Sequence, residues 1–158
     1  MKSYSARRAP VATVHLLAGL NGSDRTTFAR ELELRLPAVR FTLEEWMLRL
    51  FGLRPDDPRY GEPAGRCQDL IWDTARQVLH AGTDVILDWN QDRRAGRAGW
   101  RDRARLIGAR PVLHYLKLPP EGPADRAGAD QRSFEEPDCT ERLEVRMVYG
   151  PAETPVLA

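Results

Sequence analysis

The chain has 158 residues, of which 42% are hydrophobic and 30% are charged, and its formal net charge is +1. This length suits a single domain that buries roughly 70% of the surface of its unfolded chain. A charge so close to zero excludes a general electrostatic attraction to nucleic acid or to membranes. We therefore expect one globular domain over residues 1–158 that recognises any charged ligand locally.

The N-terminal residues imitate a secretion signal without completing one. Lys2, Arg7 and Arg8 precede an apolar run over residues 11–20, but this run is short and no convincing cleavage site follows it. The two cysteines, Cys67 and Cys139, have no partners at the spacing of a zinc site or a disulfide framework. We expect a flexible N-terminus over residues 1–10, no membrane span and a cytoplasmic protein.

The first third of the chain alternates strand and helix patterns. Residues 11–18 (VATVHLLA) are apolar and rich in branched side chains, which predicts a strand buried on both faces. Residues 26–36 carry apolar side chains at helical spacing and end at Pro37. A short strand over residues 39–42 and a helix over residues 43–51 follow. Glu44 and Glu45 favour the N-terminus of that helix.

The rest of the chain repeats this alternation. Proline and glycine predict irregular structure over residues 52–65, and apolar spacing from Cys67 predicts a helix ending near Gly82. A buried strand over residues 84–88, a helix over residues 93–107 and a strand over residues 111–118 come next. We expect a loop after Pro119 and a last helix over residues 138–149. Strands that alternate with helices predict an α/β fold in which helices cover both faces of a parallel sheet.

The stretch GLNGSDRT, residues 19–26, lies between the first strand and the first helix. In an open parallel sheet the ligand crevice lies beyond the carboxyl ends of the strands, and the free amides of a helix N-terminus bind anions. The stretch approaches the phosphate-loop pattern G-x-x-x-x-G-K-[ST], but Asp24 replaces the second glycine and Arg25 replaces the lysine. It therefore indicates a phosphate site, although a strand-to-helix turn without a ligand stays possible.

Four segments together resemble a known family. VHLLAGLNGSDRTTFARELELRLP, TLEEWM, VILDWNQDRRAGR and ARLIGARPVLHYL follow one another in the chain. In this order they are similar to P-loop kinases and ATP-binding proteins of the AAA_33 type, which are relatives of chloramphenicol phosphotransferase and zeta-toxin kinases. The resemblance covers roughly two thirds of the chain. It implies a P-loop NTPase-like three-layer sandwich with a parallel sheet of four or five strands.

The resemblance also implies the parts of an ATP and Mg²⁺ site. Glu44 would be the catalytic base, Thr26 would bind the magnesium ion, and Arg25 would neutralise the phosphates. Asp88 would either hold a magnesium-bound water or orient the nucleophile. A shortened lid-like loop over about residues 119–137 would contribute arginines to the phosphates. The residues implied in nucleotide binding are Gly19, Asn21, Gly22, Ser23, Asp24, Arg25, Thr26, Thr27, Arg126 and Arg132.

Three departures from the family pattern weaken the expected site. Asp24 would place a carboxylate about 5 Å from a phosphate charge, which costs on the order of 3 kcal/mol at an effective dielectric near 20. Arg25 keeps the positive charge but replaces a compact ammonium with a planar fork. Glu44 stands where the family has a shorter Asp, and it moves the base by roughly the 1 Å that can cost a hundredfold in rate.

Arginines gather between residues 93 and 110, where Arg93, Arg97, Arg101 and Arg105 form a basic stripe at helical spacing. Such a stripe is usually a solvated face. Alternatively, Arg94 and Arg97, which match family arginines, bind substrate or phosphate. The pattern argues against nucleic-acid binding, because aromatic residues do not alternate with the basic ones.

Tryptophans and histidines in or beside the predicted helices and strands have alternative roles. Trp72, Trp89 and Trp100 are most simply packing groups, although Trp89 directly follows Asp88 and is a candidate for lining the acceptor pocket. His15 and His114 fall within predicted core strands and are better explained as buried, hydrogen-bonded histidines than as catalytic bases.

The sequence therefore supports two functions. The first is an ATP-dependent phosphotransferase that acts on a small-molecule hydroxyl, with a degraded phosphate loop. The second is a non-catalytic, pseudokinase-like protein that uses the same crevice for another ligand or a protein partner. The sequence does not identify the acceptor.

Overall fold

A five-stranded parallel sheet organises the chain, with the strands in the order β2-β3-β1-β4-β5. The computed structural model describes residues 11–19, 25–117 and 134–149. The predicted parallel sheet of four or five strands is confirmed, and it has five. The strands are β1 (Thr13–Gly19), β2 (Ala38–Thr42), β3 (Asp84–Asn90), β4 (Arg110–Lys117) and β5 (Glu144–Tyr149).

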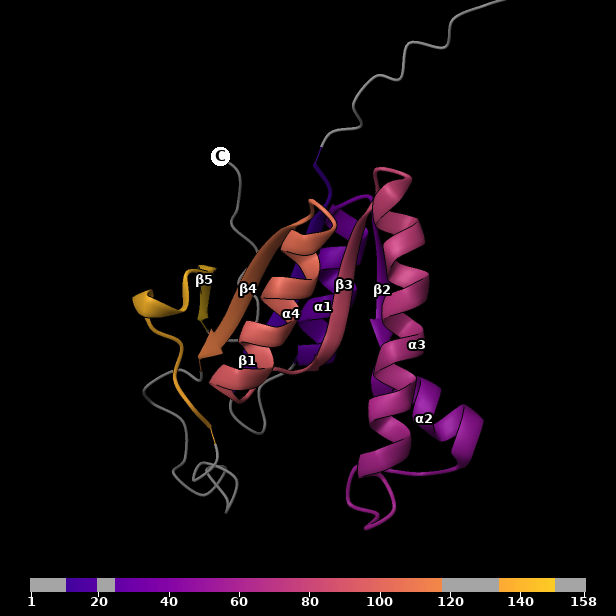
Figure 1. Cartoon of the computed structure of the whole chain (residues 1–158). Helices are drawn as coiled ribbons and strands as arrows, with labels where there is room; N and C mark the ends of the chain where they lie inside the picture. The colour runs from indigo at the N-terminus through magenta and orange to yellow at the C-terminus, as the bar shows by residue number, and fades with distance from the viewer. Residues whose placement is uncertain (1–10, 20–24, 118–133, 150–158) are drawn as a thin grey trace, which may run out of the picture.

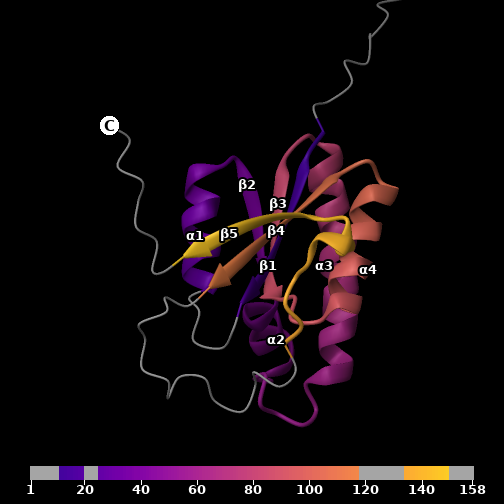
Figure 2. The same ribbon diagram turned by 90° about the vertical axis from the view of Figure 1, so that its left-hand side faces the viewer.

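Helices cover both faces of this sheet, as predicted for a three-layer α/β fold (Figures 1 and 2). The helix α1 (Arg25–Arg35) lies on one face, where Ala29 packs against Leu17 and Ile86. The helices α2 (Leu43–Phe51), α3 (Gly61–His80) and α4 (Arg94–Leu106) contribute to the larger core on the opposite face. None of the described helices has the length and apolar character that crossing a membrane requires.

Three tryptophans occupy the centre of the larger core. The ring of Trp100 in α4 lies edge-on to Trp89 in β3 and to Trp72 in α3, with ring centroids 5.2 and 5.7 Å away. All three side chains are buried. Edge-to-face aromatic pairs stabilise a core beyond the area that they bury. The expected packing role of these tryptophans is therefore confirmed.

The segment over residues 52–65 is less irregular than its composition predicts. Gly52 ends α2 with a φ of 65°, and its amide donates to the carbonyl of Leu48. The irregular part stops at Tyr60, because α3 begins at Gly61 and includes Pro63. Pro63 lies in the first turn of α3, where a missing N–H breaks no helical hydrogen bond. Proline therefore marks the start of this helix rather than a loop.

The predicted helix over residues 138–149 is wrong. A short 3-10 helix (Cys139–Glu141) is followed by β5, which pairs with β4 and aligns Val145 with Leu113. Arg142 separates the two with a left-handed φ of 55°. Leu143 and Met147 have helical spacing, but Val145 packs against the core and the β-branched Val145 and Val148 suit a strand. Pairing with β4 therefore outweighs the helical spacing.

Candidate nucleotide and acceptor site

The carboxyl end of the central strand β1 leads directly to the N-terminus of α1. Gly19 ends β1 and Arg25 begins α1. Thr26 is half-buried and Thr27 is exposed in the first turn of that helix. The free amides of this turn therefore lie at the carboxyl edge of the sheet, where the sequence predicts a phosphate site. Asn21, Gly22, Ser23 and Asp24 of the predicted loop lie outside the described residues.

Two polar contacts hold the start of this loop. The Arg25 guanidinium donates from Nη1 to the carbonyl oxygen of Gly19, at 3.1 Å. The amide of Gly19 donates to Oδ1 of Asn90 in β3, at 3.4 Å. Arg25 therefore uses one of its donors on the backbone of its own loop. Asn90 was not expected to take part in the site.

Strand β3 changes register beside the loop. Leu16 aligns with Leu87, but Leu17 aligns with Asn90, so Asp88 and Trp89 fall in the irregular stretch between them. Such bulges direct side chains away from regular alternation and are common beside functional sites. The amide of Gln91 then restores contact by donating to the carbonyl of Leu17.

Asp88 has a neutral partner at the end of β2. The Thr42 hydroxyl donates to Oδ2 of Asp88 at 2.8 Å, and the two residues are only 5% and 4% exposed. Arg40 donates to the same Thr42 oxygen. Because a hydroxyl has one hydrogen, Thr42 can accept from Arg40 while it donates to the Asp88 carboxylate. Thr42 was missed by the sequence reasoning, although it ends a predicted strand at the correct edge.

Glu44 lies in the first turn of α2 and is exposed. Burial raises the pKa of the neighbouring Tyr60, and the negative charge of Glu44 raises it further. This places the Glu44 carboxylate near Tyr60, where α3 begins. Its assignment as the catalytic base stays a prediction.

Trp89 turns to the face opposite Asp88, into the tryptophan core. Its side chain is 8% exposed, and its indole Nε1 has no hydrogen-bond partner among the described residues. Buried donors are usually satisfied, so this N–H is unusual. A role for Trp89 in the acceptor pocket stays a prediction.

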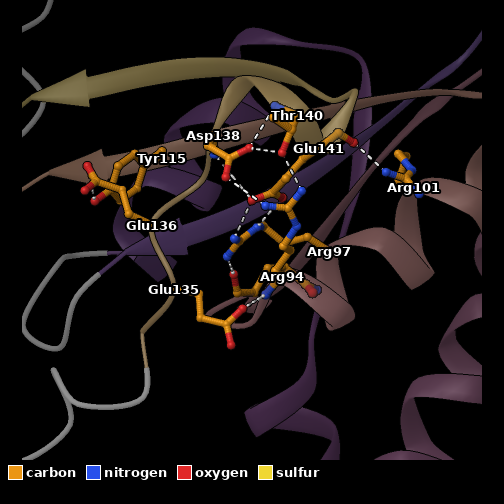
Figure 3. A network of polar contacts seen from close by, with 10 residues as sticks. Arg94, Arg97, Arg101, Tyr115, Glu135, Glu136, Asp138, Thr140 and Glu141 are labelled. Atoms are coloured by element: carbon orange, nitrogen blue, oxygen red, sulfur yellow. Dashed lines mark hydrogen bonds and ion pairs between the residues drawn. The ribbon is translucent and has the colours of Figure 1, made fainter.

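Arginines of α4 contact other parts of the chain, and Figure 3 shows this network for Arg94, Arg97 and Arg101. Arg97 is fully buried and forms a bidentate ion pair with Glu141, with Nε to Oε2 at 2.8 Å and Nη2 to Oε1 at 2.7 Å. Burial alone would raise the pKa of Glu141, but the Arg97 guanidinium outweighs it and holds that pKa below its ordinary value. Arg97, a candidate for binding substrate, is thus buried with an internal partner in this structure.

The neighbouring arginines follow the same pattern. Arg94 donates to Asp138 and Thr140, Arg101 to the carbonyl of Glu141, and Arg105 to the carbonyl of Arg142. The expectation of a solvated stripe is therefore wrong for Arg97, which is buried, and only partly right for Arg101, which is half-buried, whereas Arg93 and Arg105 are exposed as expected. Sequence reasoning missed these contacts because the partners lie about 40 residues further along the chain, in a segment predicted to be a loop and a helix.

His15 and His114 form a buried pair on the face covered by α1, as predicted. His15 Nδ1 lies 2.9 Å from His114 Nε2, and His15 Nε2 lies 3.0 Å from Oδ2 of Asp84. A proton on His15 Nε2 satisfies the Asp84 carboxylate, so His15 Nδ1 accepts and His114 Nε2 donates. Burial is the largest cause that lowers the pKa of His114 to about 3, and the neighbouring His15 contributes to the same shift.

Arg126 and Arg132 of the expected lid lie outside the described residues, as do residues 1–10. In the described ranges, no group of three or more His, Cys, Asp and Glu side chains forms a metal cluster. The two predicted magnesium residues, Thr26 and Asp88, supply oxygen atoms from α1 and β3, which is the ligand type that Mg²⁺ prefers. Their assignment to a magnesium ion stays a prediction.

Comparisons with known proteins agree with this fold. The AAA_33 family model, described as an AAA domain, matches residues 14–147. No curated protein sequence matches the chain. Among solved structures, Kti12 from Chaetomium thermophilum in complex with ADP-AlF3 is 14% identical with a TM-score of 0.63, over 86% of this chain and 88% of that one.

Two further structures are similar. The APS kinase CysC of Mycobacterium tuberculosis, in complex with AMPPNP and APS, is 14% identical with a TM-score of 0.59 over 89% of each chain. A chain of the Pnkp1/Rnl/Hen1 complex is 21% identical with a TM-score of 0.57 over 66% of this chain. The match spans about a third of that longer chain, since it covers 35% of it. At these identities the likeness shows a shared fold.

Proposed function

The chain belongs to the AAA_33 family, and from this premise we propose that it is a P-loop phosphotransferase that moves the γ-phosphate of ATP to a small-molecule hydroxyl. One observation carries the proposal. Asp88, held by Thr42, lies at the carboxyl edge of the sheet beside the strand that leads into the N-terminus of α1. A buried carboxylate and free helical amides at one edge offer a cation site next to an anion site.

Each part of this edge has a task in phosphoryl transfer, which depends on positioning and charge neutralisation. The first-turn amides of α1 bind phosphate oxygens, and Arg25 adds a positive charge. Thr26 and Asp88 hold a magnesium ion, which would neutralise charge on the phosphates. The Thr42 hydroxyl fixes the orientation of Asp88, and Glu44 accepts the proton of the acceptor hydroxyl.

The similar structures support this proposal through their ligands. Kti12 was solved with ADP-AlF3, and the APS kinase with AMPPNP and APS. Both ligand sets include an adenine nucleotide or its analogue. Their identity to this chain is low, so they support the nucleotide class rather than an acceptor.

A second function, a non-catalytic binding protein, is favoured by one contact. Arg25 donates to the carbonyl of Gly19, so the cation that should neutralise phosphates also holds its own loop. Asp24 adds a negative charge to that loop. In this alternative the crevice binds another ligand or a protein partner, and no phosphate is transferred.

Calorimetric titration with ATP and Mg²⁺ separates the two functions. The kinase proposal expects the wild type to bind with a Kd well below 1 mM, and the double variant Asp24→Gly/Arg25→Lys to bind more tightly. Removing the Asp24 charge should improve affinity up to about a hundredfold, because about 3 kcal/mol of repulsion is relieved. Binding by the double variant alone would favour the non-catalytic alternative.

Measuring turnover of the variant Asp88→Asn tests the proposed role of Asp88. Asp88→Asn keeps the size of the side chain and its contact with Thr42 but removes the charge that would hold the ion. We expect γ-phosphate transfer to fall by about two orders of magnitude or more with little change in fold. Equal turnover in Asp88→Asn and the wild type would exclude the proposed role of Asp88.

A further inference from the structure

Residues 134–142, which we call the strap, lie along α4 before β5 begins (Figure 3). Four arginines of α4 donate to it, namely Arg94, Arg97, Arg101 and Arg105. A backbone hydrogen bond from the amide of Glu135 to the carbonyl of Asp92, at 2.8 Å, attaches its first part. The strap therefore contacts both the first turn of α4 and the segment that precedes it.

The contacts at the two ends of the strap differ in strength. At its far end, the Arg97 and Glu141 side chains are 0% and 4% exposed, and breaking this ion pair would leave a buried charge without a partner. At its near end, the Arg94 and Asp138 side chains are 47% and 49% exposed, and such pairs contribute little in water. The contacts of Arg94 can therefore be exchanged at a lower cost than the pair of Arg97 and Glu141, although Phe134, stacked on Tyr115, and Glu136, paired with Lys117, also hold this part of the strap.

The near end holds groups that bind anions. The backbone amide of Arg94, the first residue of α4, donates to Oε2 of Glu135 at 2.9 Å, and its guanidinium donates to Oδ2 of Asp138 at 2.8 Å. A helix N-terminus and an arginine fork both suit a phosphate. In this chain two carboxylates of the strap occupy them.

Arg94 is connected to the phosphate loop through Asn90, which contacts Gly19. Arg94 follows Asn90 by four residues, a span of at most about 14 Å, and Asn90 accepts from the amide of Gly19. Arg97 also donates to the carbonyl of Gln91 at 3.0 Å, and the amide of Gln91 donates to Leu17 in β1. The strap and the loop are thus joined through Gln91 and Asn90.

Gln91 supplies an independent sign of a missing partner. Its side chain is 3% exposed, and Nε2 has no hydrogen-bond partner among the described residues. Its Oε1 faces the first turn of α4, because a Cβ built at Gly96 would lie 3.7 Å from it. The side-chain amide of Gln91 is therefore buried against the first turn of α4 with one donor unsatisfied, which is uncommon for a buried polar group.

We propose that the strap is an autoinhibitory contact, in which Glu135 and Asp138 occupy Arg94 in place of a phosphate group of the ligand. A phosphate-bearing ligand displaces these two carboxylates, and Glu141 remains on Arg97 as the fixed end. The inference rests on the proposed nucleotide site, since it assigns Arg94 to the phosphates bound there.

Neutralising the strap tests this inference. The double variant Glu135→Gln/Asp138→Asn removes both carboxylates, while the amide oxygen that replaces the Asp138 carboxylate can still cap the 3-10 helix. Calorimetry with sodium tripolyphosphate at low ionic strength should show roughly three- to tenfold tighter binding than the wild type. Adding Arg94→Ala should remove the gain. Unchanged or weaker binding, or no binding by either protein, would overturn the inference.

Hydrogen exchange reports the movement itself. Tripolyphosphate should speed exchange at the Glu135 amide, because its bond to Asp92 is lost, and should leave the amides of β5 unchanged. Full protection of Glu135 at saturating ligand would contradict the proposal.

The experiments distinguish a wrong strap inference from a wrong kinase function. If ATP binds the wild type but the double variant gains nothing, the strap inference alone is wrong. If the double variant gains affinity for tripolyphosphate and no protein transfers phosphate, the kinase function alone is wrong.

Discussion

The carboxyl edge of the sheet and the junction between α4 and the strap both concentrate charged side chains, but they balance charge differently. At the edge, Asp88 is held by the neutral hydroxyl of Thr42. At the junction, Arg97 and Glu141 neutralise each other in a buried bidentate pair. At the edge, the Asp88 carboxylate has a hydroxyl as its direct partner, with Arg40 on the other side of that hydroxyl, whereas at the junction two opposite charges contact each other directly. Arg97, which resembles a ligand-binding arginine in sequence, is therefore structural, because a buried carboxylate neutralises it.

Removing Glu141 should have the largest effect. Glu141→Gln leaves the Arg97 charge buried without a counter-charge, which costs about 3 to 5 kcal/mol. For a chain of this size we expect the thermal midpoint to fall by roughly 10 °C, measured by calorimetry or circular dichroism. The double variant Arg97→Met/Glu141→Leu should recover much of the loss, because it removes both charges. A midpoint within 2 °C of the wild type for Glu141→Gln, allowing about 2 °C per kcal/mol, would contradict a structural junction.

Substitutions of Thr42 should change the activity of the site at the carboxyl edge of the sheet. Thr42→Val removes the donor to Asp88 with little change in volume, whereas Thr42→Ser keeps it. Leaving a buried acceptor unsatisfied costs about 1 to 3 kcal/mol, and we expect the loss to fall mainly on Mg²⁺-dependent nucleotide binding or turnover. Equal behaviour of the valine and serine variants would show that the hydroxyl does not orient Asp88.

On the face covered by α1, His15 and His114 need no counter-charge, because burial lowers the pKa of both and favours their neutral forms. The pKa of His114 is lowered to about 3, so the unfolded chain binds a proton between pH 6.5 and 3 that the folded chain excludes. This part of the stability is complete above about pH 6.5 and is lost as the pH falls.

The pH dependence of the urea midpoint distinguishes the buried histidine pair from an exposed histidine. We expect the urea midpoint to fall between pH 7 and pH 5, and His114→Gln to reduce that slope. The exposed His80 provides the control, since His80→Gln should keep the slope of the wild type. A slope that His114→Gln leaves unchanged would show that other groups cause the acid sensitivity.

The smallest effect is expected at the exposed pair of Arg110 and Glu144. Both side chains are more than a third exposed, and such pairs contribute about 0 to 1 kcal/mol. Arg110→Gln should shift the midpoint by less than about 3 °C in a thermal scan. A loss comparable to that of Glu141→Gln would remove the distinction between buried and exposed pairs.

Local patterns predicted most of the fold. The apolar run ending in Gly19 and the helical spacing after Arg25 placed β1 and α1 in sequence, and with them the site of the loop. Strand β5 was missed because strand pairing over long sequence distances leaves a weak trace in a six-residue stretch. The Arg97 and Glu141 pair was missed for the same reason, because its members are 44 residues apart and each is common on a surface. Thr42 could have been found, since it ends a predicted strand beside Asp88.

A crystal structure of the protein grown with ADP, aluminium fluoride and Mg²⁺ tests the central assignment most directly. The account predicts phosphate oxygens within about 3 Å of the first amides of α1, and a magnesium ion about 2.1 Å from the Thr26 hydroxyl with Asp88 on the ion or one of its waters. It also predicts that Arg25 leaves the carbonyl of Gly19 for the phosphates. Nucleotide absent from this edge at saturating concentration, with Arg25 still bound to Gly19, would contradict it.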